Sequence, residues 1–132
     1  SGEIVSAVSG GEARVGVTLE ETACKRIAAG DEIALVYPAD GTSCVPDGTA
    51  VVSGAPHAEN ARAFVDFTIS RDVQNLLQSA LSRRSVRTDL DAPEGLPPLA
   101  DIAMVDYNVR WASEMRESLL MSWEFYFGAE EP

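Results

Sequence analysis

Three oxygen-bearing side chains, Thr18, Glu20 and Glu21, stand together where an expected strand gives way to an expected helix. The amino end of a helix presents unpaired N–H groups and a partial positive charge, so a carboxylate or phosphate of a ligand could bind beside Thr18. Glu20 or Glu21 could instead give carboxylate oxygen to a hard cation or to a cationic group of a ligand. The same residues form a capping box, Thr-Leu-Glu-Glu, in which Thr18 and Glu21 cap each other. A shared hydroxyl would allow both roles.

A second pair of ligand-binding candidates, Thr42 and Ser43, lies in the stretch 38–48, whose Gly, Pro and Asp content is typical of a loop. Their hydroxyls and backbone amides could hydrogen-bond the oxygens of a ligand. They could equally stabilise a turn beside Gly41. Both interpretations stay open on the residues alone.

Three arginines, Arg83, Arg84 and Arg87, follow an expected helix and could clamp an anion through bidentate contacts. Basic residues directly after a helix also complement the partial negative charge of its carboxyl end. We favour this structural role over anion binding.

No residue pattern predicts an enzyme, a cofactor or a metal centre. The single histidine, His57, precedes an expected helix without a second ligand at metal-binding spacing, so we expect a capping or surface role. Cys24 and Cys44 lack CxxC spacing and could be free thiols or one disulfide. The acidic stretch 89–94 lacks the glycine and the distal glutamate of a calcium loop. The phosphate-binding, dinucleotide-binding and nucleophile-elbow motifs are also absent from the sequence.

The composition, 45% hydrophobic and 23% charged, is that of a soluble globular protein. The formal net charge is −11 and the sequence has no basic stripe, so the chain would repel the phosphate backbone, which argues against nucleic-acid binding. The sequence has no apolar run of the ~18 residues that a membrane helix needs. Because Ser1-Gly2-Glu3 does not resemble a signal peptide, we expect any export signal to precede this sequence.

The first half of the chain alternates expected strands with expected helices. A short helix over 4–9 ends at a Gly-Gly pair, and the alternating pattern of 13–18 predicts a strand. A helix should begin at Leu19 and run to about residue 28, before the apolar run 33–37, which suits a strand buried on both faces. Strand, helix and strand make a βαβ unit. A further strand is expected over 49–52.

The second half is expected to be helical. The apolar spacing predicts a helix over 58–69, then another in which Ser70 is the N-cap. This second helix carries the stripe Val73, Leu76, Leu77, Ala80 and Leu81. Residues 83–98 are expected to form a surface loop because of their prolines and acids. One long helix, packed by its aromatic residues, is expected over 107–127.

Several ordered segments carry a family resemblance. The run 11–21, Gly-Glu-Ala-Arg-Val-Gly-Val-Thr-Leu-Glu-Glu, resembles a stretch of the type 2 solute-binding proteins that serve ABC importers, in the group of ferric-ion and phosphonate binders. Further similar segments follow at matching spacing: 37–38, 41–48, 54–61, 64–67, 83–87 and 96–99, leading into Asp106-Tyr107. The resemblance covers nearly the whole chain.

The resemblance implies an α/β chain with part of the type 2 periplasmic-binding-protein fold. Residues 1–45 would be the C-terminal portion of lobe 2 with a hinge strand, and 46–132 the C-terminal portion of lobe 1, ending in a long helix. The N-terminal half or more of such a protein would lie outside this sequence. Edges and apolar faces left uncovered would favour oligomerisation or strand exchange.

The resemblance also implies a bacterial transport protein without enzymatic activity, which captures a small ligand in the cleft between the lobes and delivers it to ABC permease subunits. It would work at the periplasmic or extracellular face of the membrane, secreted or anchored as a lipoprotein through an upstream N-terminus. In the family the junction at Thr18 faces the cleft.

The ligand implied is a small anion of the phosphonate or phosphate kind. Ferric-ion binders of this family place adjacent tyrosines near this junction, and the corresponding positions here are Glu21 and Thr22, which argues against a ferric-tyrosinate site. A ferric-ion-binding transport protein and the ligand-sensing domain of a signalling receptor stay as alternatives.

Overall fold

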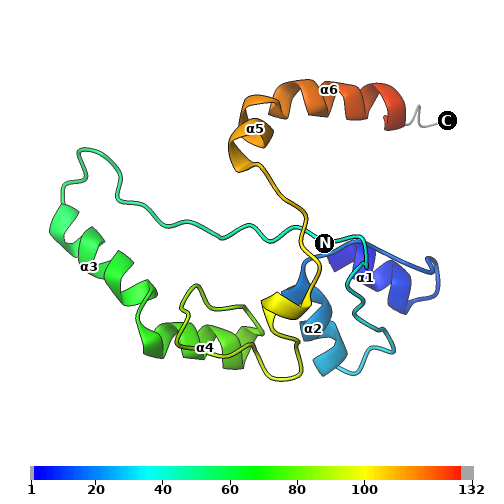
Figure 1. Cartoon of the computed structure of the whole chain (residues 1–132), viewed down its shortest axis with the longest axis horizontal. Coiled ribbons are helices and arrows are strands. Elements are labelled where there is room, and N and C mark those ends of the chain that lie inside the picture. The colour runs from blue at the N-terminus through cyan, green and yellow to red at the C-terminus, as the bar shows by residue number, and fades with distance from the viewer. Residues whose placement is uncertain (1, 129–132) are drawn as a thin grey trace.

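A computed structural model describes residues 2–128. In its first third, α1 (Gly2–Ser9) and α2 (Glu20–Ala28) lie side by side (Figure 1). The exit of α1 is the predicted one, with Gly11 at a φ of 80° and the N–H of Gly10 donating to the Ser6 carbonyl at 2.8 Å. A β-carbon on Gly16 would lie 2.5 Å from the Ile4 side chain, so glycine is needed where the connecting segment crosses α1.

The helical pair α3 (Ala58–Thr68) and α4 (Arg71–Leu81) confirms the two helices predicted over 58–69 and after Ser70. Ser70 is the N-cap of α4, and its hydroxyl accepts from the N–H of Val73 at 3.5 Å. At the other end, Ser82 takes a left-handed conformation with a φ of 53°, so the chain turns away. The predicted loop over 83–98 follows, without regular secondary structure in that range.

The predicted long helix over 107–127 is wrong, because two helices stand there, α5 (Val109–Glu114) and α6 (Arg116–Phe127). Met115 separates them with φ −93° and ψ 0°, outside helical geometry. A long helix there requires its aromatic stripe to pack against a core, yet Trp123 and Tyr126 are exposed. With no packed face to hold both segments on one axis, the helical direction is free to change at Met115.

The predicted strands over 13–18, 33–37 and 49–52 are not formed, and the part of the chain over 2–128 contains no strand. Its one β pairing is an isolated parallel bridge between Thr42 and Met104. A strand is stabilised by hydrogen bonds to a neighbouring strand, and these segments run without one. The βαβ unit is therefore reduced to its helix α2, and the structure does not confirm the predicted α/β lobe.

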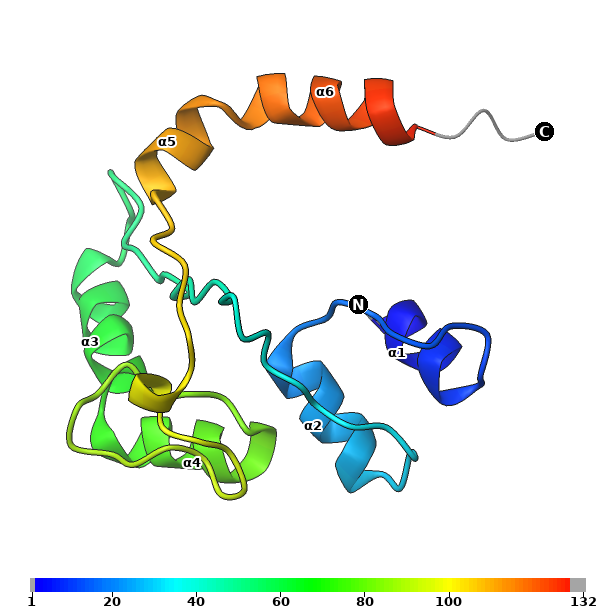
Figure 2. The same ribbon diagram turned by 45° about the vertical axis from the view of Figure 1, so that its right-hand side comes forward.

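The molecule is open, with α5 and α6 standing apart from the other helices in both views (Figures 1 and 2). Its accessible surface is 10898 Å². A compact monomer of this mass would expose only about 6,700 Å². The buried hydrophobic residues of the described chain are few, namely Val5, Ala23 and Ile102. Within 2–128, no helix has the length and apolar character needed to cross a membrane.

Candidate functional site

The amino end of α2 begins one residue later than predicted, which changes the roles of its neighbours. Leu19 occupies the N-cap position, and no side chain caps the helix. The predicted capping box between Thr18 and Glu21 is therefore wrong, because the shift moves Thr18 outside the cap. The Thr18 hydroxyl is buried and has no hydrogen-bond partner in the structure.

The carboxylate of Glu20 is held by a side chain from the distant loop after α4. Arg84 donates from Nε to Glu20 Oε1 at 2.9 Å and from Nη2 to Glu20 Oε2 at 3.0 Å, across a sequence separation of 64 residues. Its Nη1 donates to the carbonyl of Pro97 at 2.8 Å. The Tyr37 hydroxyl donates to Glu20 Oε2 at 2.6 Å. This is a bidentate, charge-assisted arrangement, the strongest geometry for such a pair.

Partial burial gives this network its electrostatic character. Only 14% of the Arg84 side chain and 22% of the Glu20 side chain are exposed. Burial, followed by the hydrogen bond to Glu20, raises the pKa of Tyr37. Burial alone would lower the pKa of Arg84, but its bonds to Glu20 and Tyr37 outweigh burial and raise it. The guanidinium and the phenol therefore stay protonated at neutral pH.

Glu21 is engaged by the adjacent arginine. Arg83 Nε lies 2.6 Å from Glu21 Oε2, and Arg83 Nη2 pairs with Asp47. Both glutamates at the start of α2 are thus neutralised by arginines from beyond α4, and neither carboxylate is a free ligand group. The sequence favours a role for these arginines at the carboxyl end of α4 and does not predict this pairing. The signal for it is an acidic doublet at 20–21 matched by a basic doublet at 83–84.

Thr42 and Ser43 are placed differently from Thr18 and the glutamates. The N–H of Thr42 donates to the Ala103 carbonyl and its carbonyl accepts from the N–H of Val105, each at 3.0 Å, so the backbone of Thr42 is used in the isolated bridge. The Ser43 side chain is exposed. Among the interactions of residues 2–128, no hydrogen bond or ion pair joins Thr42 or Ser43 to the glutamates of α2.

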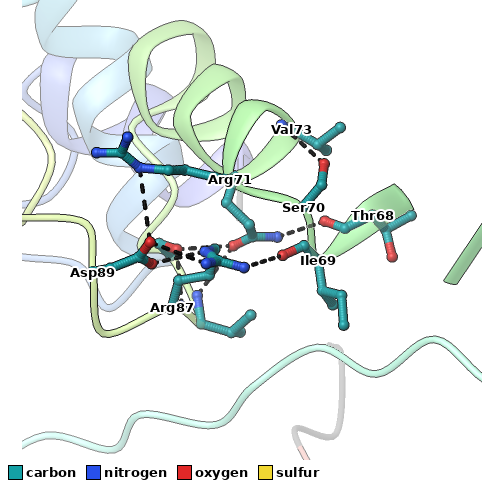
Figure 3. Close-up of polar contacts among 10 residues, drawn as sticks. Thr68, Ile69, Ser70, Arg71, Val73, Arg87 and Asp89 are labelled. Carbon is teal, nitrogen blue, oxygen red and sulfur yellow. Dashed lines mark hydrogen bonds and ion pairs between the residues drawn. The ribbon is translucent and has the colours of Figure 1, made fainter. Parts of the chain in front are cut away.

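A polar groove of about 590 Å³ lies elsewhere, between α4 and the loop 89–94. Beside it, Arg71 and Arg87 both approach Asp89 (Figure 3). Arg87 Nε donates to Asp89 Oδ1 at 2.7 Å, and Arg87 Nη1 donates to the Ile69 carbonyl at 3.1 Å. The Arg87 guanidinium lowers the pKa of Asp89, and the bond to Asp89 raises the pKa of Arg87. These contacts fasten the loop to the α3–α4 corner, where residues 69–70 join the two helices. None of the predicted ligand residues lines the groove.

The remaining candidates take structural or surface positions. His57 is the N-cap residue of α3, although its side chain makes no capping hydrogen bond. Cys24 and Cys44 are free thiols, so of the two open alternatives the disulfide is not formed. In the described range, no three of the His, Cys, Asp and Glu side chains gather as a metal site would require.

Comparisons with known proteins give the chain its family. A model of the bacterial extracellular solute-binding protein family matches residues 4–120. An uncharacterized protein of Haemophilus influenzae (strain ATCC 51907 / DSM 11121 / KW20 / Rd) is 26% identical over 117 residues, which cover 86% of this chain and 34% of the relative. The chain thus spans about a third of the length of that relative. No solved structure matches. Because the family model covers most of its residues, the chain belongs to the bacterial extracellular solute-binding proteins.

Proposed function

We propose that the protein is the solute-binding component of an ABC importer, which captures a small solute between two lobes and delivers it to permease subunits. The family match over residues 4–120 carries this proposal. Such a protein performs no covalent chemistry, in keeping with the lack of catalytic motifs in the sequence. Its place of work is the periplasm or the extracellular face of the membrane, with a lipid anchor upstream of this sequence as one means of retention.

The amino end of α2 is the proposed ligand-contacting edge of this chain. The first turn of a helix leaves N–H groups without intrahelical acceptors and carries a partial positive charge. The buried hydroxyl of Thr18, which has no partner, lies directly before this turn. An oxygen of a ligand that accepts from these groups would satisfy them.

Charge at this edge supports a small anionic ligand of the phosphonate or phosphate kind. Free carboxylates at Glu20 and Glu21 would repel an anion. Arg84 and Arg83 neutralise them, so the partial positive charge of the helix end is not opposed by two unpaired carboxylates. In this proposal Glu20 and Glu21 shape and hold the edge, while Thr42 and Ser43 contribute hydroxyls from the hinge crossing, which is the stretch 38–48 where the chain would pass between the lobes.

Lobe closure supplies the mechanism. A ligand drives closure only by the difference between its affinities for the closed and open states. Contacts from Thr18 and from the hinge crossing to the same ligand would form only when the lobes close, and they would provide part of that difference.

A thermal-shift experiment on the full-length protein tests the proposal. The panel is methylphosphonate, a sugar phosphate and ferric citrate, each at increasing concentration. A ligand that binds only the native state at about 100 times its Kd adds roughly 2.7 kcal/mol of stability, which raises Tm by several degrees. We expect a phosphonate or phosphate ester to give this rise.

Two variants make the experiment specific to the amino end of α2. Thr18→Val keeps the side-chain shape and removes the hydroxyl, and it should weaken the ligand-dependent rise in Tm. Thr88→Val, at an exposed position in the loop after α4, is the matched control and should leave the rise unchanged. A flat Tm across all three ligand classes would contradict the transport role, and a rise with ferric citrate alone would replace the anion with iron.

A further inference from the structure

The arginine clasp is the set of ion pairs that Arg83 and Arg84 make with Glu20, Glu21 and Asp47. In each pair with Glu20 or Glu21, one partner belongs to residues 1–45 and the other to residues 46–132, the two portions assigned to different lobes. The clasp therefore crosses the boundary along which the lobes of a solute-binding protein would separate. This inference rests on the proposed function for its meaning, and on the ion pairs for its geometry.

Specific polar contacts join the two portions. The helices pack mainly with their neighbours in sequence, α1 with α2, α3 with α4, and α5 with α6. Between the two portions the chief specific links are the isolated bridge at Thr42 and the clasp. An interlocked apolar core resists separation, whereas the charged partners of an ion pair regain their hydration when they part. Such a junction suits a contact that forms and breaks repeatedly.

Arg84 is the centre of the clasp because it is anchored on both sides. One edge of its guanidinium holds Glu20 and the Tyr37 hydroxyl from the first portion, and Nη1 holds the Pro97 carbonyl of the second. A lysine could not reproduce these bonds, since its ammonium is a single point of contact.

We propose that the arginine clasp is a latch between the two lobe portions, closed in this structure and open when the lobes part, and that Arg84 is the positioning residue that holds α2 in the closed arrangement. Opening the latch frees the face of α2 on which Glu20 lies. Ligand binding and latch closure then favour the same state, so the latch sets part of the free energy of closure before a ligand arrives.

Cys24 provides an internal reporter of the latch. It lies one helical turn after Glu20 on α2 and is half-buried, whereas Cys44 is exposed. Burial, followed by the charge of Glu20, raises the pKa of the Cys24 thiol, and the charge of Arg84 lowers it. A substitution of Arg84 has two consequences for Cys24. Loss of the positive charge alone would make the thiol less reactive, because that charge lowers its pKa. Opening of the latch would make the thiol more accessible and more reactive, so the two consequences have opposite signs.

The test measures alkylation of the intact protein by iodoacetamide, a neutral reagent, at neutral pH without ligand. Peptide mass spectrometry separates Cys24 from Cys44, and Cys44 serves as the internal reference. Arg84→Gln should raise the rate at Cys24 relative to Cys44 about fivefold, the size expected for loss of one partly buried ion pair. Wild-type protein in 1 M NaCl should move in the same direction, because salt screens the pairs.

Control variants keep the result interpretable. Arg110→Gln removes an exposed pair with Glu114 on α5 and should leave the Cys24 rate unchanged. Arg84→Lys, which retains the charge and is the milder change, should give a smaller rise than Arg84→Gln. If Arg84→Gln does not fold, Arg84→Lys and wild-type protein in salt decide the matter by themselves.

A Cys24 rate that is unchanged or lower in the Arg84 variants would overturn the latch. So would a rise that appears only together with loss of helical circular dichroism, because Arg84 would then be a structural residue and no latch. The labelling needs no ligand, so the two proposals can fail separately. A flat thermal-shift screen with a faster Cys24 rate in the Arg84 variants would contradict the transport role and support the latch. A ligand-dependent rise in Tm with an unchanged Cys24 rate would support the transport role and contradict the latch.

Discussion

The α3–α4 corner and the extended segments 13–18 and 33–37 differ in where their stabilising contacts lie. In the corner, Ser70 caps α4 and Gln74 bonds to the carbonyl of Thr68, all within a few residues. The extended segments leave Val17 90% and Val36 76% exposed, with no neighbouring strand. Hydrogen bonds between residues near in the sequence help to stabilise the corner, whereas strands need backbone partners that these segments do not have.

Among substitutions in the α3–α4 corner, we expect the largest loss of stability at Gln74, which is 8% exposed. Its amide nitrogen donates to the Thr68 carbonyl at 2.8 Å, and its amide oxygen accepts from Ser85 Oγ and the N–H of Val86, each at 3.1 Å. Gln74→Leu leaves these partners unsatisfied, at a cost of about 2 to 4 kcal/mol in the free energy of unfolding. Urea denaturation followed by circular dichroism measures the loss.

Gln78→Leu is the control for this substitution. Gln78 donates to the Asp91 carbonyl at an exposed position, so water can replace the bond and the cost should stay below about 1 kcal/mol. Equal losses in the two variants would mean that the buried network does not distinguish the corner from the rest of the chain.

A smaller effect is expected at the cap of α4. Ser70→Ala removes the acceptor for the N–H of Val73 and should cost about 1 kcal/mol. The matched substitution is Ser43→Ala, at an exposed position outside any helix, where the change should be near zero. If Ser70→Ala is as neutral as Ser43→Ala in urea denaturation, the corner owes its order to something other than capping.

The sequence predicted the elements whose signals are local. The glycine exit of α1 and the Ser70 cap are written in neighbouring residues and were confirmed. The start of α2 was predicted one residue early, because Thr18 fits a capping box but the chain enters the helix through Leu19. The predicted strands required partners that no local pattern can supply.

The candidate site was predictable to the same extent. The sequence pattern locates the glutamates at the start of α2, but it does not predict that their carboxylates are paired with arginines. Their neutralisation depends on Arg84, which lies 64 residues from Glu20 in the sequence. Charge doublets hint at such a pairing, yet only the fold decides which arginine meets which carboxylate. The apolar pattern of 33–37 places Tyr37 in a buried strand, and nothing in that pattern indicates that its hydroxyl donates to Glu20.

The extended segments should respond to substitution in the opposite way from the corner. Val17→Thr combined with Val36→Thr should change the free energy of unfolding by less than about 0.5 kcal/mol, because both side chains are already exposed. The same double variant should reduce self-association, which we expect for a chain with so much uncovered apolar surface. Light scattering coupled to size-exclusion chromatography reports the mass of both proteins. A wild-type chain that is monomeric throughout would refute the expected oligomerisation.

The smallest expected effect is at Asp89, where the loop is tied to the corner through Arg87 and Arg71 (Figure 3). The Arg87 guanidinium lowers the pKa of Asp89 in the folded protein below its usual value of 3.8. Its stabilising contribution is therefore present above the unfolded pKa and is lost as pH falls through the lower folded pKa.

Asp89→Asn removes this contribution. The urea midpoint of the variant should therefore lie slightly below that of the wild type at pH 6, and the two midpoints should converge as pH falls through the folded pKa of Asp89. Asp72→Asn, on the first turn of α4, is the matched change without an ion pair to Arg87. A difference between Asp89→Asn and wild type that persists undiminished at low pH would show that the loop is held by contacts other than this carboxylate.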